Sequence, residues 1–272
     1  MILPLRLNGR EVRLIAALHL PPLPGSGHPM ARSIDEIIDY ARRNAEAAFN
    51  NGIDALCIQD LSDYPIDREV EPYTIASMAA VGYDLRVAFP DKVLGICLME
   101  HGAKEPLGIA RAIEAHLVRL KVYVGAMVKA EGILEGCASE AIRYRAQIGA
   151  EGVAILADIY DRTGMPLAPL PLVEAARHAA TFGRADGLIL TGQSFDESLE
   201  MLAQVRAVDL GVPLFLGGGA NEENILRALK VADGVIVSSA LKATTGWSRA
   251  ALASEWSEDK IRAFVAAAKT AE

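Results

Sequence analysis

The clearest pattern along the chain is a series of short apolar runs, each bounded by Gly, Asp or Pro. Most runs are apolar throughout rather than alternating with polar residues, which is typical of parallel strands covered on both faces. The predicted strands cover residues 12–20, 53–59, 93–99, 117–122, 152–158, 185–191, 212–217 and 233–238. None of the runs approaches the ~18 unbroken apolar residues that a membrane span needs.

Segments with apolar residues at helical spacing separate these runs. Ser33, with Glu36 three residues later, predicts a capping box at the start of the first helix, and Gly52 predicts its end. The other predicted helices cover residues 73–89, 105–115, 132–148, 171–182, 196–208, 222–231 and 257–269. Strands and helices in strict alternation favour a (β/α)8 barrel, a TIM barrel, that forms a single domain over residues 1–272. An open, doubly wound sheet is the alternative.

Composition narrows the class of protein. The 272 residues are 51% hydrophobic and 23% charged, enough apolar material for one large core. Because 27 basic and 35 acidic residues give a net charge of −8 without a basic cluster, we expect no binding to nucleic acid. Cys57, Cys97 and Cys137 fit neither a disulfide framework nor a zinc site, and residues 1–8 lack a signal-peptide core. We therefore expect a cytoplasmic protein without integral membrane association.

The ends of the last two predicted strands indicate an anion site, because barrels bind ligands at the C-terminal ends of their strands. Glycines let backbone N–H groups approach an anion closely, and a short helix beginning near Ser239 would add its positive end. Lys242 would add a positive charge. The predicted phosphate-binding residues are Gly217, Gly218, Gly219, Ser238, Ser239 and Lys242. The alternative is that the glycines only form a tight turn and the serines only cap a helix.

Charged residues at other strand ends are candidates for catalysis. Arg119 and Lys121 lie two apart and project to the same side of their strand. Facing the barrel interior they would form a buried positive pair; facing outward they would lie between helices. Asp158 closes the fifth strand and is predicted to be a general base or the partner of Lys121, with a loop cap as the alternative.

His19 and a group of acidic residues are less specific candidates. His19 follows an apolar strand and would serve in acid/base chemistry, as a metal ligand or as a structural residue. Asp60 and Asp63, with Glu100 and His101 after the next strand, would form an oxygen-rich metal site. The alternative is that these are solvated loop residues. No cofactor is required by the sequence, and a divalent metal is the one candidate.

Several blocks of sequence occur in an order that resembles one protein family. They are HLPPLPGS at 19–26, IDALCIQDLSDYPI at 53–66, GAMVKAEGILEGCASEAIRYR at 125–145, ILAD at 155–158, ADGLILTG at 185–192, GGGANEEN at 217–224 and ADGVIVSSALK at 232–242. With these blocks the chain resembles the BtpA/SgcQ family, named for a cyanobacterial photosystem I biogenesis factor and a protein of an enteric sugar operon. The resemblance implies a TIM barrel.

The chain also departs from the family pattern at strand ends two to five. The family usually carries Glu-Asn at Gln59-Asp60, Arg-Asn-Asp at Glu100-His101-Gly102, Asn at Lys121 and Lys-His at Arg162-Thr163. The family type is kept at His19, Arg119, Asp158, Thr191-Gly192 and Lys242. We infer that the chain belongs to a subgroup that keeps the anion-binding residues but differs in the part of the barrel mouth that would hold the rest of the substrate.

Together these features predict an enzyme for a small phosphorylated metabolite, either a sugar phosphate or a nucleoside-derived phosphate. Isomerase, aldolase or lyase chemistry is expected, with proton transfer by Asp158 and His19 and oxyanion stabilisation by Arg119 and Lys121. Glu100 is a further catalytic candidate, and Lys121 could instead form a Schiff base. The alternative is a non-catalytic assembly or regulatory factor, as the BtpA name implies. The expected partners are a small anionic ligand and, since barrels often dimerise, further copies of the chain.

Overall fold

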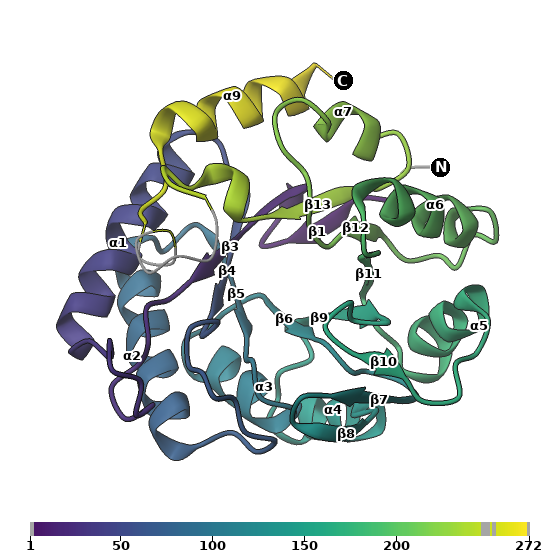
Figure 1. The fold of residues 1–272 in the computed structure, drawn as a ribbon, viewed down its shortest axis with the longest axis horizontal. Coiled ribbons are helices and arrows are strands. Elements are labelled where there is room, and N and C mark those ends of the chain that lie inside the picture. Colours follow the sequence, from purple (N-terminus) through teal and green to yellow (C-terminus); the bar gives the residue numbers. More distant parts are fainter. Residues whose placement is uncertain (1–2, 246–250, 252–253, 271–272) are drawn as a thin grey trace.

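A closed barrel of eight parallel strands forms the centre of the molecule (Figure 1). The computed structural model describes residues 3–245, 251 and 254–270. The barrel strands are β3 (Leu14–His19), β4 (Ala55–Gln59), β5 (Val93–Cys97), β6 (Leu117–Leu120), β9 (Ala154–Ile159), β11 (Gly187–Leu190), β12 (Leu214–Leu216) and β13 (Gly234–Val237). They follow one another around the barrel in chain order, and β13 pairs with β3 to close it. The predicted barrel is confirmed, and the open-sheet alternative is wrong.

Helices surround the barrel on its outer face (Figure 1). They are α1 (Ile34–Asn50), α2 (Pro72–Ala88), α3 (Lys104–Ala112), α4 (Ala138–Gln147), α5 (Leu172–Arg177), α6 (Phe195–Arg206), α7 (Ile225–Ala228) and α9 (Glu258–Lys269). The predicted capping box is present, because the Ser33 hydroxyl accepts from the Glu36 N–H and the Glu36 carboxylate accepts from the Ser33 N–H. Two predicted helices differ in detail. α5 continues as a π-helical turn over His178–Phe182, and α7 is shorter than predicted.

The helix predicted over residues 132–148 is wrong in its first part. Residues Ala126–Lys129 (β7) and Gly132–Glu135 (β8) form an antiparallel hairpin, and the helix begins only at Ala138. Met165–Pro166 (β10) pairs with β7 to complete a small three-stranded sheet beside the barrel. The sheet has a buried face, where Met127 and Leu134 pack with Val122.

The interior of the barrel is filled with its own side chains and closed at the N-terminal end of the strands. The strands β1 (Leu5–Leu7) and β2 (Arg10–Val12) form a hairpin. Its side chains Leu5, Leu7 and Val12 join the interior apolar cluster that contains Ile15 and Phe215. This hairpin therefore covers the N-terminal end of the barrel.

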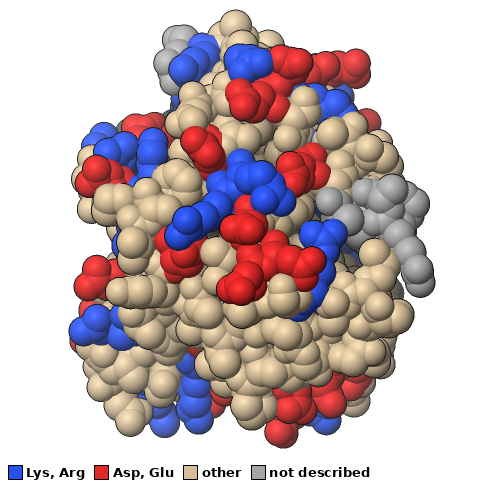
Figure 2. All heavy atoms as spheres, turned by 90° about the vertical axis from the view of Figure 1, so that its left-hand side faces the viewer, with Lys and Arg blue, Asp and Glu red and all other residues tan. Residues whose placement is uncertain are grey.

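The outer surface carries charges of both signs. Figure 2 shows the side on which α1 and α2 lie, where positive and negative side chains are interspersed. Arg42 on α1 pairs with Asp84 on α2 at 2.5 Å, and Arg43 pairs with Glu255 at 2.9 Å. Neither sign dominates this face. In the described parts of the chain, no helix combines the length and apolar character needed to cross a membrane.

Candidate active site

Polar side chains form a ring inside the C-terminal mouth of the barrel. Side chains two residues apart on a strand share a face, so each interior apolar residue is followed two positions later by another inward residue. Ile236 lies in the interior cluster and leads to Ser238, and Leu117 leads in the same way to Arg119. The same step along the other strands leads to His19, Gln59, Met99, Asp158, Thr191 and Gly217.

A cavity of about 640 Å³ occupies this mouth. Its volume lies within the ~300–1,000 Å³ of small-molecule sites. The predicted site residues that line it are His19, Arg119, Lys121, Gly217, Gly218, Gly219, Ser238 and Ser239. The other three predicted site residues, Asp158, Glu100 and Lys242, do not line it. The structure thus brings most of the predicted residues to one place.

One wall of the cavity is lined by residues whose backbone N–H groups are available to a ligand. Gly218, Gly219, Ser239 and Ala240 line this wall, and their N–H groups have no hydrogen-bond partner within the described residues. Gly219 has a φ of +85°, a conformation that glycine adopts at no steric cost. Neighbouring N–H groups without protein partners make a concave site for an anion. We call these four residues the amide wall.

A buried hydroxyl lies beside the amide wall. The Thr191 Oγ1 atom has no hydrogen-bond partner among the described residues, although it is buried. A Cβ atom on Gly217 would collide with this oxygen, so only glycine fits at 217 with Thr191 in place. Since a buried hydroxyl without a partner costs stability, a bound ligand would supply the missing hydrogen bond.

A guanidinium group from the loop after β9 faces the same wall. The Arg162 Nη2 atom lies 3.7 Å from the place that a Cβ on Gly218 would take. Arg162 also lines the cavity, and its side chain has no ion pair within the described part of the chain. Guanidinium groups bind phosphate through paired N–H donors. Arg162 was not among the phosphate-binding residues predicted from the sequence, because the direction of its side chain depends on the path of a loop.

Lys242 lies apart from the cavity. Its side chain is buried, and its Nζ donates to the carbonyl of Ala251 at 3.2 Å. The helix expected near Ser239 is only a single 3-10 turn, Ser239–Leu241. The predicted contact between Lys242 and phosphate has no support in this geometry.

Arg119 and Asp158 form an ion pair at the floor of the cavity. Arg119 Nε and Nη2 each donate to one carboxylate oxygen of Asp158 at 2.8 Å. The Asp158 side chain is only 2% exposed. Burial raises the pKa of Asp158, while the Arg119 charge and hydrogen bonds act against that rise. The predicted pairing of Asp158 with Lys121 is wrong, because the guanidinium group offers two parallel donors to the carboxylate.

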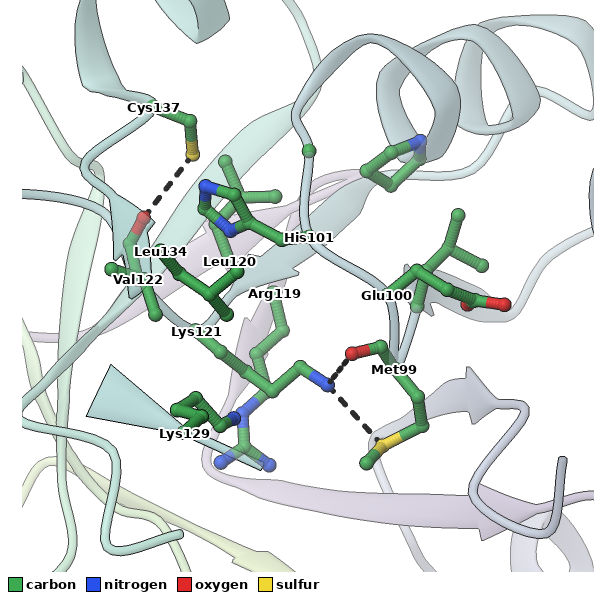
Figure 3. Close-up of a pocket in the computed structure, with 13 residues that line it drawn as sticks. Met99, Glu100, His101, Arg119, Leu120, Lys121, Val122, Lys129, Leu134 and Cys137 are labelled. Carbon is green, nitrogen blue, oxygen red and sulfur yellow. Dashed lines mark hydrogen bonds between the residues drawn. The ribbon is translucent and has the colours of Figure 1, made fainter. Parts of the chain in front are cut away.

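Lys121 turns toward β5 and not toward Asp158. Its Nζ donates to the Met99 carbonyl at 2.8 Å and lies 3.2 Å from the Met99 sulfur (Figure 3). Burial lowers the pKa of Lys121. Figure 3 also shows that the carboxylate of Glu100 points away from this amine. Both Arg119 and Lys121 therefore face inward, as the first of the two sequence-based alternatives predicted.

His19 lines the cavity next to the eighth strand. Its Nδ1 lies 3.2 Å from the Ser238 hydroxyl. Burial, followed by the charges of Lys242 and Arg119, lowers the pKa of His19 to about 3. The imidazole is therefore neutral near pH 7, and it would take up a proton only where a bound anion offsets the neighbouring positive charges.

The acidic residues after β4 and β5 form a buried group below the loops. Asp60 accepts from the Met99 N–H at 2.8 Å, and Asp63 accepts from the Leu23 N–H at 2.7 Å. Burial raises the pKa of Asp60 well above its usual value, and the Glu100 charge adds to that rise. These residues are thus not the solvated loop acids of the sequence-based alternative.

The same group does not form the predicted metal site. His101 points to the carbonyl of Glu135, 2.7 Å away, and not to the acids. Within the described residues, no three His, Cys, Asp or Glu side chains are placed so that they could hold a metal ion. Glu100 reaches Thr74 at 3.4 Å and stays outside the main cavity.

Comparison with known proteins assigns the chain to a family. The model of the BtpA family matches residues 10–270. The chain belongs to the BtpA family. The photosystem I biogenesis protein BtpA of Synechocystis is 33% identical over 84% of this chain and 80% of its own length. An uncharacterized protein of Archaeoglobus fulgidus is 35% identical over 85% and 92%, so the BtpA family is not confined to bacteria.

Solved structures with the same fold are more distant in sequence. The 3-keto-L-gulonate-6-phosphate decarboxylase of Vibrio cholerae superposes with a TM-score of 0.57 at 13% identity. The match covers 96% of this BtpA-family chain and 99% of the decarboxylase. At this identity the similarity supports the barrel fold alone.

Proposed function

We propose that this protein is an enzyme that binds a small phosphorylated metabolite in the mouth of the barrel. The observation that carries the proposal is the amide wall, with four N–H groups that have no partner within the described residues. In this scheme the phosphate binds the amide wall, the Thr191 hydroxyl and the Arg162 guanidinium. A sugar phosphate or a nucleoside-derived phosphate fits this description.

The carbon skeleton of the substrate would extend toward the charged residues at the floor of the cavity. Arg119 and Lys121 would stabilise negative charge that develops on a substrate oxygen. Neutral His19 would accept and return a proton. Asp158 would position Arg119 and not transfer protons itself, because both its oxygens already accept from that guanidinium. This arrangement suits isomerase, aldolase or lyase chemistry. The Vibrio cholerae decarboxylase with this fold is named for a sugar phosphate, 3-keto-L-gulonate 6-phosphate. That name is consistent with such a role for the fold.

A thermal unfolding assay with inorganic phosphate tests the proposal. A ligand of the folded state adds stability of RT ln(1 + [L]/Kd), which is about 2.7 kcal/mol at 100 times Kd. We expect phosphate to raise the Tm, and glucose 6-phosphate to do so where glucose does not. Gly218→Asp should abolish the shift, because it places a carboxylate in the anion site where a Cβ meets no close neighbour.

Gly152→Asp is the matched control, since a Cβ at this surface glycine meets no atom within 4 Å. It should keep the phosphate-dependent shift. The absence of any anion-dependent shift in the unmodified protein would overturn the proposal. That result would favour a non-catalytic assembly role, which the name of the Synechocystis relative suggests.

A further inference from the structure

Lys121 is unusual among the buried cations of the barrel mouth because no carboxylate pairs with it. Arg119 is paired with Asp158, and Lys129 on β7 is paired with Asp161 at 2.7 Å. In the described residues, the hydrogen-bond acceptors of the Lys121 amine are the Met99 carbonyl and sulfur. A buried ammonium group without an anionic partner is costly, and loss of its proton relieves that cost.

The surroundings of Lys121 act on its proton in both directions. Burial is the main cause that lowers its pKa, and the charge of Lys129 acts in the same sense. Cys97, Asp60 and Asp161 act in the opposite sense but do not outweigh burial. An amine that is desolvated and next to another cation is the setting in which lysine serves as a nucleophile.

Lys121 also lies where a bound substrate would reach it. It lines the same cavity as the amide wall. Around the closed barrel, β6 and β13 are separated by three strands in either direction, so Lys121 and Ser239 follow strands on opposite sides of the mouth. A ligand with its phosphate at the amide wall would therefore extend its far end toward the Lys121 amine.

We propose that Lys121 condenses with a carbonyl group of the substrate to form an imine. The substrate is then an aldehyde or ketone that carries its phosphate group and its carbonyl group at separate ends. This inference rests on the proposed function of the cavity. The free amine attacks the carbonyl carbon, a C–N bond forms, and the C=O electron pair moves to oxygen. A proton passes from nitrogen to that oxygen. After a second proton arrives from solvent, the C–O bond breaks, water leaves, and the C=N bond forms.

The imine would activate a bond of the substrate on which the other residues of the cavity can act. Once protonated, its nitrogen draws electrons from a bond at the adjacent carbon, which weakens that bond. Neutral His19 lines the same cavity and can accept a proton released from the substrate. Hydrolysis, with the reverse proton movements, returns Lys121 to the free amine and releases the product.

Reductive methylation of the whole protein at pH 7 tests the inference. Formaldehyde is a carbonyl compound small enough to enter the cavity, and cyanoborohydride reduces its imine to a stable methyl group. We expect peptide mapping to find Lys121 methylated before the half-buried Lys92 and the exposed Lys104. Lys129 is the buried control and should stay unmodified, because its amine is engaged in the ion pair with Asp161. Methylation of Lys121 no faster than that of Lys92 would overturn the proposal.

Trapping with phosphorylated carbonyls then tests the substrate class. Dihydroxyacetone phosphate and glyceraldehyde 3-phosphate, each with borohydride, should add covalently to Lys121 and not to Lys121→Arg, which keeps a long hydrogen-bond donor but has no nucleophilic amine. No adduct at Lys121 with either compound would overturn the assignment of this substrate class. Loss of trapping with an intact phosphate-dependent Tm shift refutes the imine alone. Trapping without any such shift refutes the phosphate site alone.

Discussion

Asp158 and Arg119 show how a charged pair can serve as part of a barrel interior. Asp158 offers Arg119 two hydrogen bonds and a counter-charge in a place that water hardly reaches. Removal of the carboxylate charge would leave a buried guanidinium uncompensated. Breaking the pair would leave a buried charge without a partner, and this cost is larger than the net stabilisation that the attraction between the two side chains provides.

We expect Asp158→Asn to lower the free energy of unfolding by about 3 kcal/mol, because breaking a buried ion pair leaves an unpaired charge. Urea denaturation measures this loss. The matched control is Glu255→Gln, which breaks the exposed pair with Arg43 and should cost less than about 1 kcal/mol. Equal costs for the two variants would contradict the buried character of the Arg119 pair.

Single residues also show the limit of sequence-based reasoning about the site. The strand-end rule identified Arg119, Lys121 and His19 correctly as inward residues, because alternation along a strand is a local property. Partner choice is not local. Whether Asp158 meets Lys121 or Arg119 depends on side-chain reach across two strands, and the direction of Arg162 depends on a loop path that no sequence pattern fixes.

The hairpin of β7 and β8 is the element for which the prediction from sequence, a helix beginning at residue 132, was wrong. The residues 132–148 carry apolar side chains at spacings compatible with a helix, and the first few are too short a run to show alternation clearly. Pairing with β7 and burial of Leu134 against Met127 decide the outcome. The barrel strands were easier to predict, since most of them are apolar throughout.

The two faces of β8 give a direct test of this register. Leu134 is 4% exposed, and Ile133 is 49% exposed. Leu134→Ala should cost about 2 kcal/mol of stability by leaving a cavity, whereas Ile133→Ala should stay within about 0.5 kcal/mol. Urea denaturation of both variants provides the comparison. Similar costs at the two positions would show that the strand register is wrong.

The three cysteines can report on whether the molecule unfolds as one body. Cys57, Cys97 and Cys137 are all buried, and they lie on β4, on β5 and just before α4. If residues 1–272 form one domain, we expect no thiol to react with Ellman's reagent in the native protein and all three to react together on unfolding. The rate of labelling in increasing urea measures this. Early reaction of one thiol would indicate a part that opens independently.

The hairpin of β1 and β2 has a consequence for the traffic of small molecules. Leu5, Leu7 and Val12 fill the barrel from its N-terminal end, so within the described residues the cavity does not continue through the barrel to that end. Substrate and product would therefore both pass through the C-terminal mouth of the barrel. If the reaction joins two substrates, the one that binds at the floor of the cavity has to enter first. The part of the product that derives from it has to leave last. An ordered kinetic scheme would then result from the way the N-terminal residues pack.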